Sequence, residues 1–87
     1  MTIPTSMLNK VPDITFKSGP DAEAVLEELK TYIKVYGRAT VAEYRMFANL
    51  PVIFADYKRG WTDLEEARII YSKGEFMLDM PLAEKIL

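Results

Sequence analysis

The side chains that could carry acid–base or nucleophilic chemistry are limited to carboxylates, lysines, tyrosines and hydroxyls, because the chain of 87 residues contains no histidine and no cysteine. Histidine is the commonest general base, and cysteine is the most nucleophilic ordinary side chain. Glu27 and Glu28 are adjacent in a predicted helix and therefore point in different directions. Glu65 and Glu66 fall in a predicted first helical turn, where acidic groups complement the helix dipole. We therefore predict that the chain is not an enzyme and has no catalytic residue.

The spacing of the acidic residues and glycines also gives no support for a metal or a cofactor. A hard cation needs several oxygens converging on one loop, and Asp63, Glu65 and Glu66 are too few for that. Zinc normally takes histidine or cysteine ligands. The four glycines are isolated, so they do not form a phosphate-binding loop. We predict no metal and no bound cofactor.

Basic residues supply the first candidates for binding. Four cations and two carboxylates lie between Arg38 and Gly60, and a further lysine is expected at a hairpin tip. The candidate nucleic-acid contacts are Arg38, Arg45, Lys58, Arg59 and Lys73. The formal net charge of −2 opposes this interpretation, since non-specific nucleic-acid binders are usually strongly basic. Two of these cations also stand at the predicted end of a helix, where positive charge is favoured for structural reasons.

Large apolar side chains supply the candidate contacts for a protein partner: Trp61, Ile70 and Met77. Trp61 has two interpretations. It either packs the joint between a helix and a hairpin, which its cap-like neighbours favour, or it anchors a partner at an exposed interface. Ile70 and Met77 lie on the second face of the predicted hairpin, so a bare second face would make them a contact surface.

Helical periodicity and cap signals divide the first two thirds of the chain. Apolar residues recur at intervals of three and four from Pro20 to Tyr36, which predicts a helix. Thr40 and Glu43 have the spacing of a capping box and predict a second helix that ends near Ala48. Asn49 tolerates a left-handed turn position. A third helix is then predicted from Pro51 to Arg59 (residues 51–59).

Alternating apolar residues predict a hairpin after the helices. Strands are expected at residues 68–71 and 75–80, with a turn at 72–74. Thr62 to Glu65 could open one helical turn, and residues 82–87 could form another. Residues 1–19 are predicted to be an extended arm with a short strand at 14–16, and residues 20–87 a single domain. The predicted fold is α+β, with three helices followed by a β-hairpin, in the order of a winged helix–turn–helix.

From Arg38 onward the chain resembles a group of small proteins of actinobacterial phages. The motifs that carry the resemblance are Thr40-Val41-Ala42-Glu43-Tyr44, then Asp56 and Lys58, then Gly60-Trp61-Thr62-Asp63-Leu64, then Ala67, Gly74 and Leu78-Asp79-Met80-Pro81. They span a little over half of the chain. The resemblance implies a phage origin and carries no assigned activity.

We therefore expect a small phage accessory or regulatory protein that acts by binding a protein partner or by self-association. The alternatives are a winged-helix transcriptional regulator that binds double-stranded DNA, and a structural component of the virion. No apolar run approaches the roughly 20 residues of a membrane span, and the N-terminus does not resemble a signal peptide. The expected compartment is the cytoplasm of the host cell.

Overall fold

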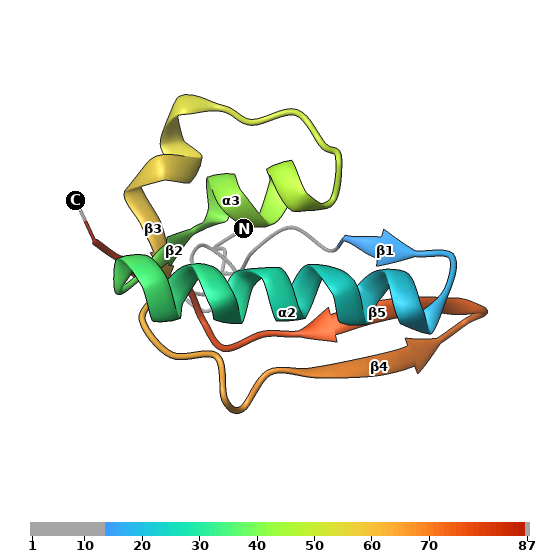
Figure 1. Ribbon diagram of the computed structural model, residues 1–87. Coiled ribbons are helices and arrows are strands. Elements are labelled where there is room, and N and C mark those ends of the chain that lie inside the picture. Colours follow the sequence, from blue (N-terminus) through green and yellow to red (C-terminus); the bar gives the residue numbers. More distant parts are fainter. Residues whose placement is uncertain (1–13, 87) are drawn as a thin grey trace, which may run out of the picture.

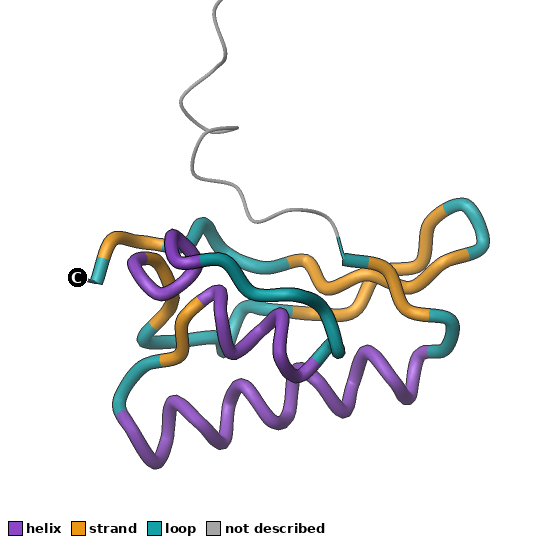
Figure 2. Tube along the Cα trace, turned by 90° about the horizontal axis from the view of Figure 1, so that it is seen from above, coloured by secondary structure: helices purple, strands orange, loops and turns teal. Residues whose placement is uncertain are grey.

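One long helix, α2 (Gly19–Tyr36), lies along one side of the structure, and a short helix and two small antiparallel sheets lie beside it (Figures 1 and 2). The computed structural model describes residues 14–86. The other elements, in chain order, are β1 (Thr15–Phe16), β2 (Ala39–Thr40), α3 (Val41–Phe47), the 3-10 helix η1 (Phe54–Lys58), β3 (Arg59–Trp61), β4 (Arg68–Ser72), β5 (Glu75–Asp79) and β6 (Glu84–Lys85). In this part of the chain, no helix is both long and apolar enough to cross a membrane.

Helix α2 confirms the first predicted helix. The Ser18 side chain accepts a hydrogen bond from the Asp21 N–H at 3.2 Å, which caps the first turn. Gly37 ends the helix with φ 86°, and its N–H donates to the carbonyl of Ile33 at 2.7 Å. The buried residues of the helix are Ala22, Val25, Leu26 and Leu29. This stripe faces the core, as the periodicity predicts.

Helix α3 confirms the second predicted helix and its end. The Thr40 N–H donates to Glu43 Oε1 at 3.1 Å, as expected for a capping box. At the other end Asn49 has φ 60°, and its N–H donates to the carbonyl of Met46 at 3.0 Å. The Leu50 N–H donates to the carbonyl of Arg45 at 2.8 Å. These two bonds form a Schellman motif with Asn49 in the left-handed position.

The first sheet has the strand order β1–β5–β4 and contains the predicted hairpin. Ile69 lies opposite Leu78, and the strands pair in antiparallel register through to the turn. Lys73 and Gly74 have φ 52° and 81°, the conformation that a two-residue type I′ turn requires. β1 pairs with the other edge of β5, which confirms the short strand predicted at residues 14–16. Of the predicted N-terminal arm at residues 1–19, residues 1–13 lie outside the described residues.

The second sheet has the order β2–β3–β6. Gly60 of β3 lies opposite Thr40 of β2. A Cβ atom on Gly60 would overlap the carbonyl of Ala39 and would lie 2.7 Å from the Cα of Thr40. The close approach of these two strands therefore requires glycine.

The core lies between α2, α3 and the two sheets. Tyr44 and Trp61 are 2% and 3% exposed, and their rings meet edge to face with centroids 5.9 Å apart. The indole Nε1 of Trp61 donates to the carbonyl of Pro81 at 2.8 Å. Trp61 thus ties the second sheet to the segment that leads into β6.

The predicted third helix at residues 51–59 is wrong. Residue Ile53 is extended, with φ −111° and ψ 162°, and the chain forms the five-residue 3-10 helix η1 after it. Val52 and Ile53 are β-branched and disfavour helix. The Asp56 carboxylate accepts the Ile53 N–H at 3.0 Å, which starts the 3-10 turn at that point. Local preference and this cap together outweigh the helix signal of Pro51.

Two further predictions of helical turns are also wrong. At residues 62–65 the Glu65 N–H donates to Asp63 Oδ1 at 2.8 Å, so the aspartate side chain forms a local turn in place of a helix start. At the C-terminal end, residues 84 and 85 form the strand β6. The winged helix–turn–helix is therefore wrong as well. The described residues form two α-helices and two three-stranded antiparallel sheets, and no third α-helix precedes the hairpin.

Candidate interaction surface

The predicted nucleic-acid contacts do not gather on one face. Lys73 is exposed at the turn between β4 and β5. Lys58 and Arg59, where η1 meets β3, lie near the opposite end of the molecule, beside the C-terminal strand. Both views show the β4–β5 turn and the C-terminal end at opposite ends (Figures 1 and 2). A continuous basic face through Lys58, Arg59 and Lys73 is therefore absent from the described residues.

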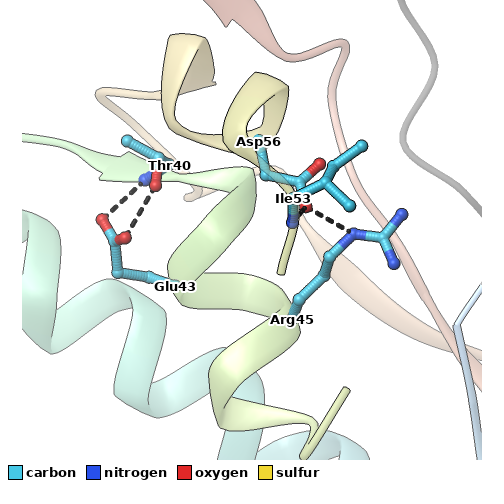
Figure 3. Close-up of polar contacts among 5 residues, drawn as sticks. All are labelled: Thr40, Glu43, Arg45, Ile53 and Asp56. Atoms are coloured by element: carbon cyan, nitrogen blue, oxygen red, sulfur yellow. Dashed lines mark hydrogen bonds and ion pairs between the residues drawn. The ribbon is translucent and has the colours of Figure 1, made fainter. Parts of the chain in front are cut away.

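Arg45 points inward, where it stabilises the segment that follows α3. Its Nε lies 3.1 Å from Asp56 Oδ2, and the two side chains are 20% and 9% exposed (Figure 3). The side-chain Nε–H group of Arg45 has no partner with hydrogen-bond geometry, so its contact with Asp56 is an ion pair held mainly by charge. The same Asp56 oxygen accepts the Ile53 N–H. Arg45 and Asp56 thus fasten η1 to α3, and this contact gives Arg45 a structural role.

Glu43 is a second carboxylate with a structural position. It is only 6% exposed, and both of its oxygens accept hydrogen bonds from Thr40: one from the N–H at 3.1 Å and one from the hydroxyl at 2.7 Å (Figure 3). Burial raises the pKa of the nearby Tyr32 hydroxyl, and the charges of Glu43 and Tyr36 act in the same direction. Both carboxylate oxygens accept hydrogen bonds from Thr40, which gives Glu43 a structural role at the start of α3.

Helix η1 and the residue before it, Ile53, present large apolar side chains to solvent. Phe54 is 78% exposed, Ile53 61% and Tyr57 44%. The ammonium group of Lys58 lies 5.0 Å from the centre of the Phe54 ring, a cation–π contact. Because the ion pair between Asp56 and Arg45 fastens η1 to α3, these exposed side chains are attached to a backbone that is held in place.

A groove of about 570 Å³ continues from η1 towards the C-terminal strand. Its lining residues are Lys58, Arg59, Leu82, Ala83, Glu84 and Lys85. Three of them are cations and one is a carboxylate, and Leu82 among them is 53% exposed. We call Phe54 together with Lys58, Arg59, Leu82, Glu84 and Lys85 the η1–β6 surface. It combines exposed apolar groups with an excess of positive charge.

Strand β6 is held in place by two hydrogen bonds at Ile86. The Ile86 N–H donates to the carbonyl of Lys58 at 3.0 Å. Arg38 Nη1 donates to the carbonyl of Ile86 at 3.4 Å. Arg38, predicted as a nucleic-acid contact, therefore contributes to the end of this strand.

The predicted partner contacts lie elsewhere. Trp61 is buried in the core, which supports its structural interpretation and leaves no exposed indole to anchor a partner. Ile70 and Met77 are directly opposite each other on β4 and β5. Ile70 is 37% exposed and Met77 is half-buried, so the second face of the hairpin is partly covered. No sequence pattern singles out Phe54, Leu82 or Lys85, because the first falls in the helix predicted at residues 51–59 and the others in the predicted C-terminal tail.

The acidic pair Glu27 and Glu28 borders a shallow, mainly apolar hollow of about 350 Å³ between α2 and α3. Its other lining residues are Thr31, Tyr32, Val35, Tyr36 and Phe47. Within residues 14–86 no group of three acidic side chains is placed to hold a metal ion.

Comparisons with known proteins give no information about the η1–β6 surface. No protein-family model, no curated protein and no solved structure matches the chain.

Proposed function

We propose that this chain is a small non-catalytic accessory or regulatory protein of a phage that acts by binding another protein through the η1–β6 surface. The resemblance from Arg38 onward supports the phage origin. The exposed aromatic and aliphatic side chains support the mode of action. Protein interfaces are enriched in aromatic residues at their centre and polar residues at their rim.

The observation that carries the proposal is the exposure of Phe54. A phenylalanine ring that is 78% exposed loses the free energy that burial would give, about 1.5–3 kcal/mol for a side chain of this kind. It stands beside Lys58, on a 3-10 helix that is fixed by a buried ion pair. Exposed aromatic side chains are enriched in protein interfaces, where a few large residues supply most of the binding energy.

The positive charge of the η1–β6 surface indicates the charge that we expect on the partner. Lys58, Arg59 and Lys85 surround the groove with Glu84 as its one carboxylate. Complementary charge raises the association rate and disfavours partners with a basic surface. We therefore expect a partner with an apolar contact surrounded by acidic residues.

A site-specific photocrosslink tests the proposal. The photoreactive amino acid p-benzoylphenylalanine replaces Phe54 in the full chain, which is then irradiated in an extract of infected host cells. The matched control carries the same group at Tyr71, which is 65% exposed at the hairpin end. We expect one dominant adduct from position 54 that unlabelled wild-type chain competes away and a Leu82→Ser chain does not.

Two results of this experiment would change the conclusion. Equal adducts from positions 54 and 71, insensitive to competition, would mean that the η1–β6 surface has no specific protein partner. An adduct with the mass of two copies of this chain would identify the partner as a second copy, and sedimentation equilibrium would then measure its affinity.

A further inference from the structure

We propose that the outer edge of β6, which pairs with no other strand of residues 14–86, pairs with an extended, acidic segment of the partner protein, which continues the β2–β3–β6 sheet by one strand. The inference rests on the proposed function, because it uses the η1–β6 surface as its site. It adds the backbone conformation and the charge of the segment that is bound. In strand addition, main-chain hydrogen bonds supply affinity and alternate side chains supply specificity.

The register of β6 leaves backbone groups that point away from β3. Lys85 lies opposite Arg59, and the Ile86 N–H donates to the carbonyl of Lys58. Hydrogen-bonded and non-hydrogen-bonded positions alternate along an antiparallel pair. The bond at Ile86 therefore makes Lys85 a position whose N–H and C=O face outward. β6 is the last strand of its sheet among the described residues, and outward groups on an edge are a template for another strand.

The charges beside this edge select an acidic strand. Arg59 and Lys85 are cross-strand neighbours, and like charges in that arrangement repel. Lys58 lines the same groove and adds a third positive charge. A carboxylate placed among these groups is attracted to all three, whereas a basic strand would increase the repulsion.

The shape of the surface accommodates a strand whose residues alternate. Side chains of a β-strand point to opposite faces in turn. Leu82 offers 53% of its side chain as an apolar contact on one side, and Phe54 extends the apolar area next to Lys58. A strand that alternates acidic and aliphatic residues therefore meets both the cations and the apolar groups.

A second copy of β6 fits this edge less well. Antiparallel pairing of two β6 strands about their outward-facing position would bring the two Lys85 side chains opposite each other. Like charges directly opposite destabilise a strand pair. The charge at Lys85 therefore disfavours pairing with a second copy of β6 and favours a partner strand of opposite charge.

Fluorescence anisotropy with the full chain and a labelled peptide of alternating valine and glutamate tests the inference. One comparison peptide alternates valine and lysine. The other keeps valine and glutamate, but carries N-methyl groups that remove its backbone donors. We expect the acidic peptide to bind, with weakening at high salt, and the N-methylated peptide to bind at least about tenfold more weakly, because its strand hydrogen bonds are lost.

Substitutions at Lys85 separate charge from backbone pairing. Lys85→Gln keeps the outward N–H and should weaken binding by about fivefold, the effect of one charge pair near 4 Å in water. Lys85→Pro removes both the charge and the outward N–H, and should abolish binding while the bonds between β3 and β6 remain. Lys73→Gln, at the other end of the molecule, is the matched control and should leave the affinity unchanged. Thermal melts check that each variant is folded.

The outcomes separate this inference from the proposed function. If the N-methylated peptide binds as well as its parent, or if duplex DNA binds more tightly than the acidic peptide with the same dependence on Lys85, strand addition is overturned. If the acidic peptide fails to bind while the crosslink at position 54 persists, the inference fails and the proposed function stands. If the crosslink is absent too, both fail.

Discussion

Two arginine–aspartate pairs of nearly equal length lie in two regions of very different burial. Arg45 Nε is 3.1 Å from Asp56 Oδ2, and their side chains are 20% and 9% exposed. Arg68 Nε is 3.2 Å from Asp79 Oδ2, and their side chains are 74% and 50% exposed. The first pair joins α3 to η1 and determines where the intervening loop lies. The second crosses a hairpin whose strands are already paired. Equal distances therefore do not imply equal importance to the fold.

The two regions also differ in what specifies them. The corner formed by α3, η1 and β3 depends on contacts between segments, including the buried ion pair and the close approach at Gly60. The β4–β5 hairpin depends on alternating side chains and a type I′ turn, which are local features. The η1–β6 surface belongs to the first region. Pairs of matched substitutions, one in each region, measure this difference.

The largest difference is expected between two aromatic residues. Trp61→Ala should destabilise the protein by about 3–5 kcal/mol, since it removes a buried ring and leaves the carbonyl of Pro81 without its donor. Tyr71→Ala should cost about 1 kcal/mol or less, because Tyr71 is 65% exposed and its one ring contact is with Phe76. Urea unfolding measures both. Equal losses would contradict the assignment of Trp61 to the core.

The next largest difference in stability is expected when one charge is removed from each ion pair. Asp56→Asn keeps an oxygen for the Ile53 N–H but leaves the Arg45 charge poorly compensated, so we expect a loss of about 2 kcal/mol. Asp79→Asn should change stability by about 0.5 kcal/mol or less, because solvent screens an exposed pair.

The salt dependence of these variants provides an internal control. The effect of Asp79→Asn should vanish at high salt, whereas most of the effect of Asp56→Asn should remain, since burial limits screening. If Asp56→Asn proved as mild as Asp79→Asn, the buried ion pair would contribute no more to stability than the exposed one.

This contrast explains which parts of the fold the sequence predicts. Local signals were sufficient for α2 and for the hairpin: the Ser18 cap and the Gly37 stop, and the alternation that ends at Lys73 and Gly74. The helix predicted at residues 51–59 relied on Pro51 and Gly60 alone. The cap from Asp56 to Ile53 was visible as a spacing of three, but the ion pair with Arg45 spans eleven positions and has no local signature.

The candidate surface was harder to predict than the fold for the same reason. Strand β6 is two residues long, and its pairing with β3 brings residues 59 and 85 together. No periodicity can be read from two residues. Lys58 and Arg59 were selected as binding residues from charge alone. Phe54 and Lys85 become candidates only in the folded chain, where the Phe54 ring lies beside Lys58 and Lys85 lines the same groove as Lys58 and Arg59.

A smaller difference is expected at the two non-glycine residues with positive φ. Asn49→Gly should change stability by about 0.5 kcal/mol or less, because asparagine already tolerates the left-handed conformation at φ 60°. Lys73→Gly, at φ 52°, should stabilise the hairpin by up to about 1 kcal/mol, because lysine is strained there and glycine is not. Thermal unfolding compares the two. A large loss in Asn49→Gly would contradict the Schellman motif at the end of α3.

The smallest effect on stability is expected at high pH and concerns Tyr32 of α2. Burial raises the pKa of Tyr32 above its usual value of 10.0, and the charge of Glu43 acts in the same direction. As pH rises through about 10, the unfolded chain loses this proton before the folded chain does, so the unfolded state binds fewer protons and stability falls. Below that pH the group contributes its full effect. Tyr32→Phe has no proton to lose at this position and should show a flatter decline in urea unfolding between pH 9 and pH 11, conditions chosen to span that value. Parallel curves for the two proteins would mean that the environment of Tyr32 does not distinguish the folded from the unfolded chain, and that the influence of Glu43 ends at its hydrogen bonds with Thr40.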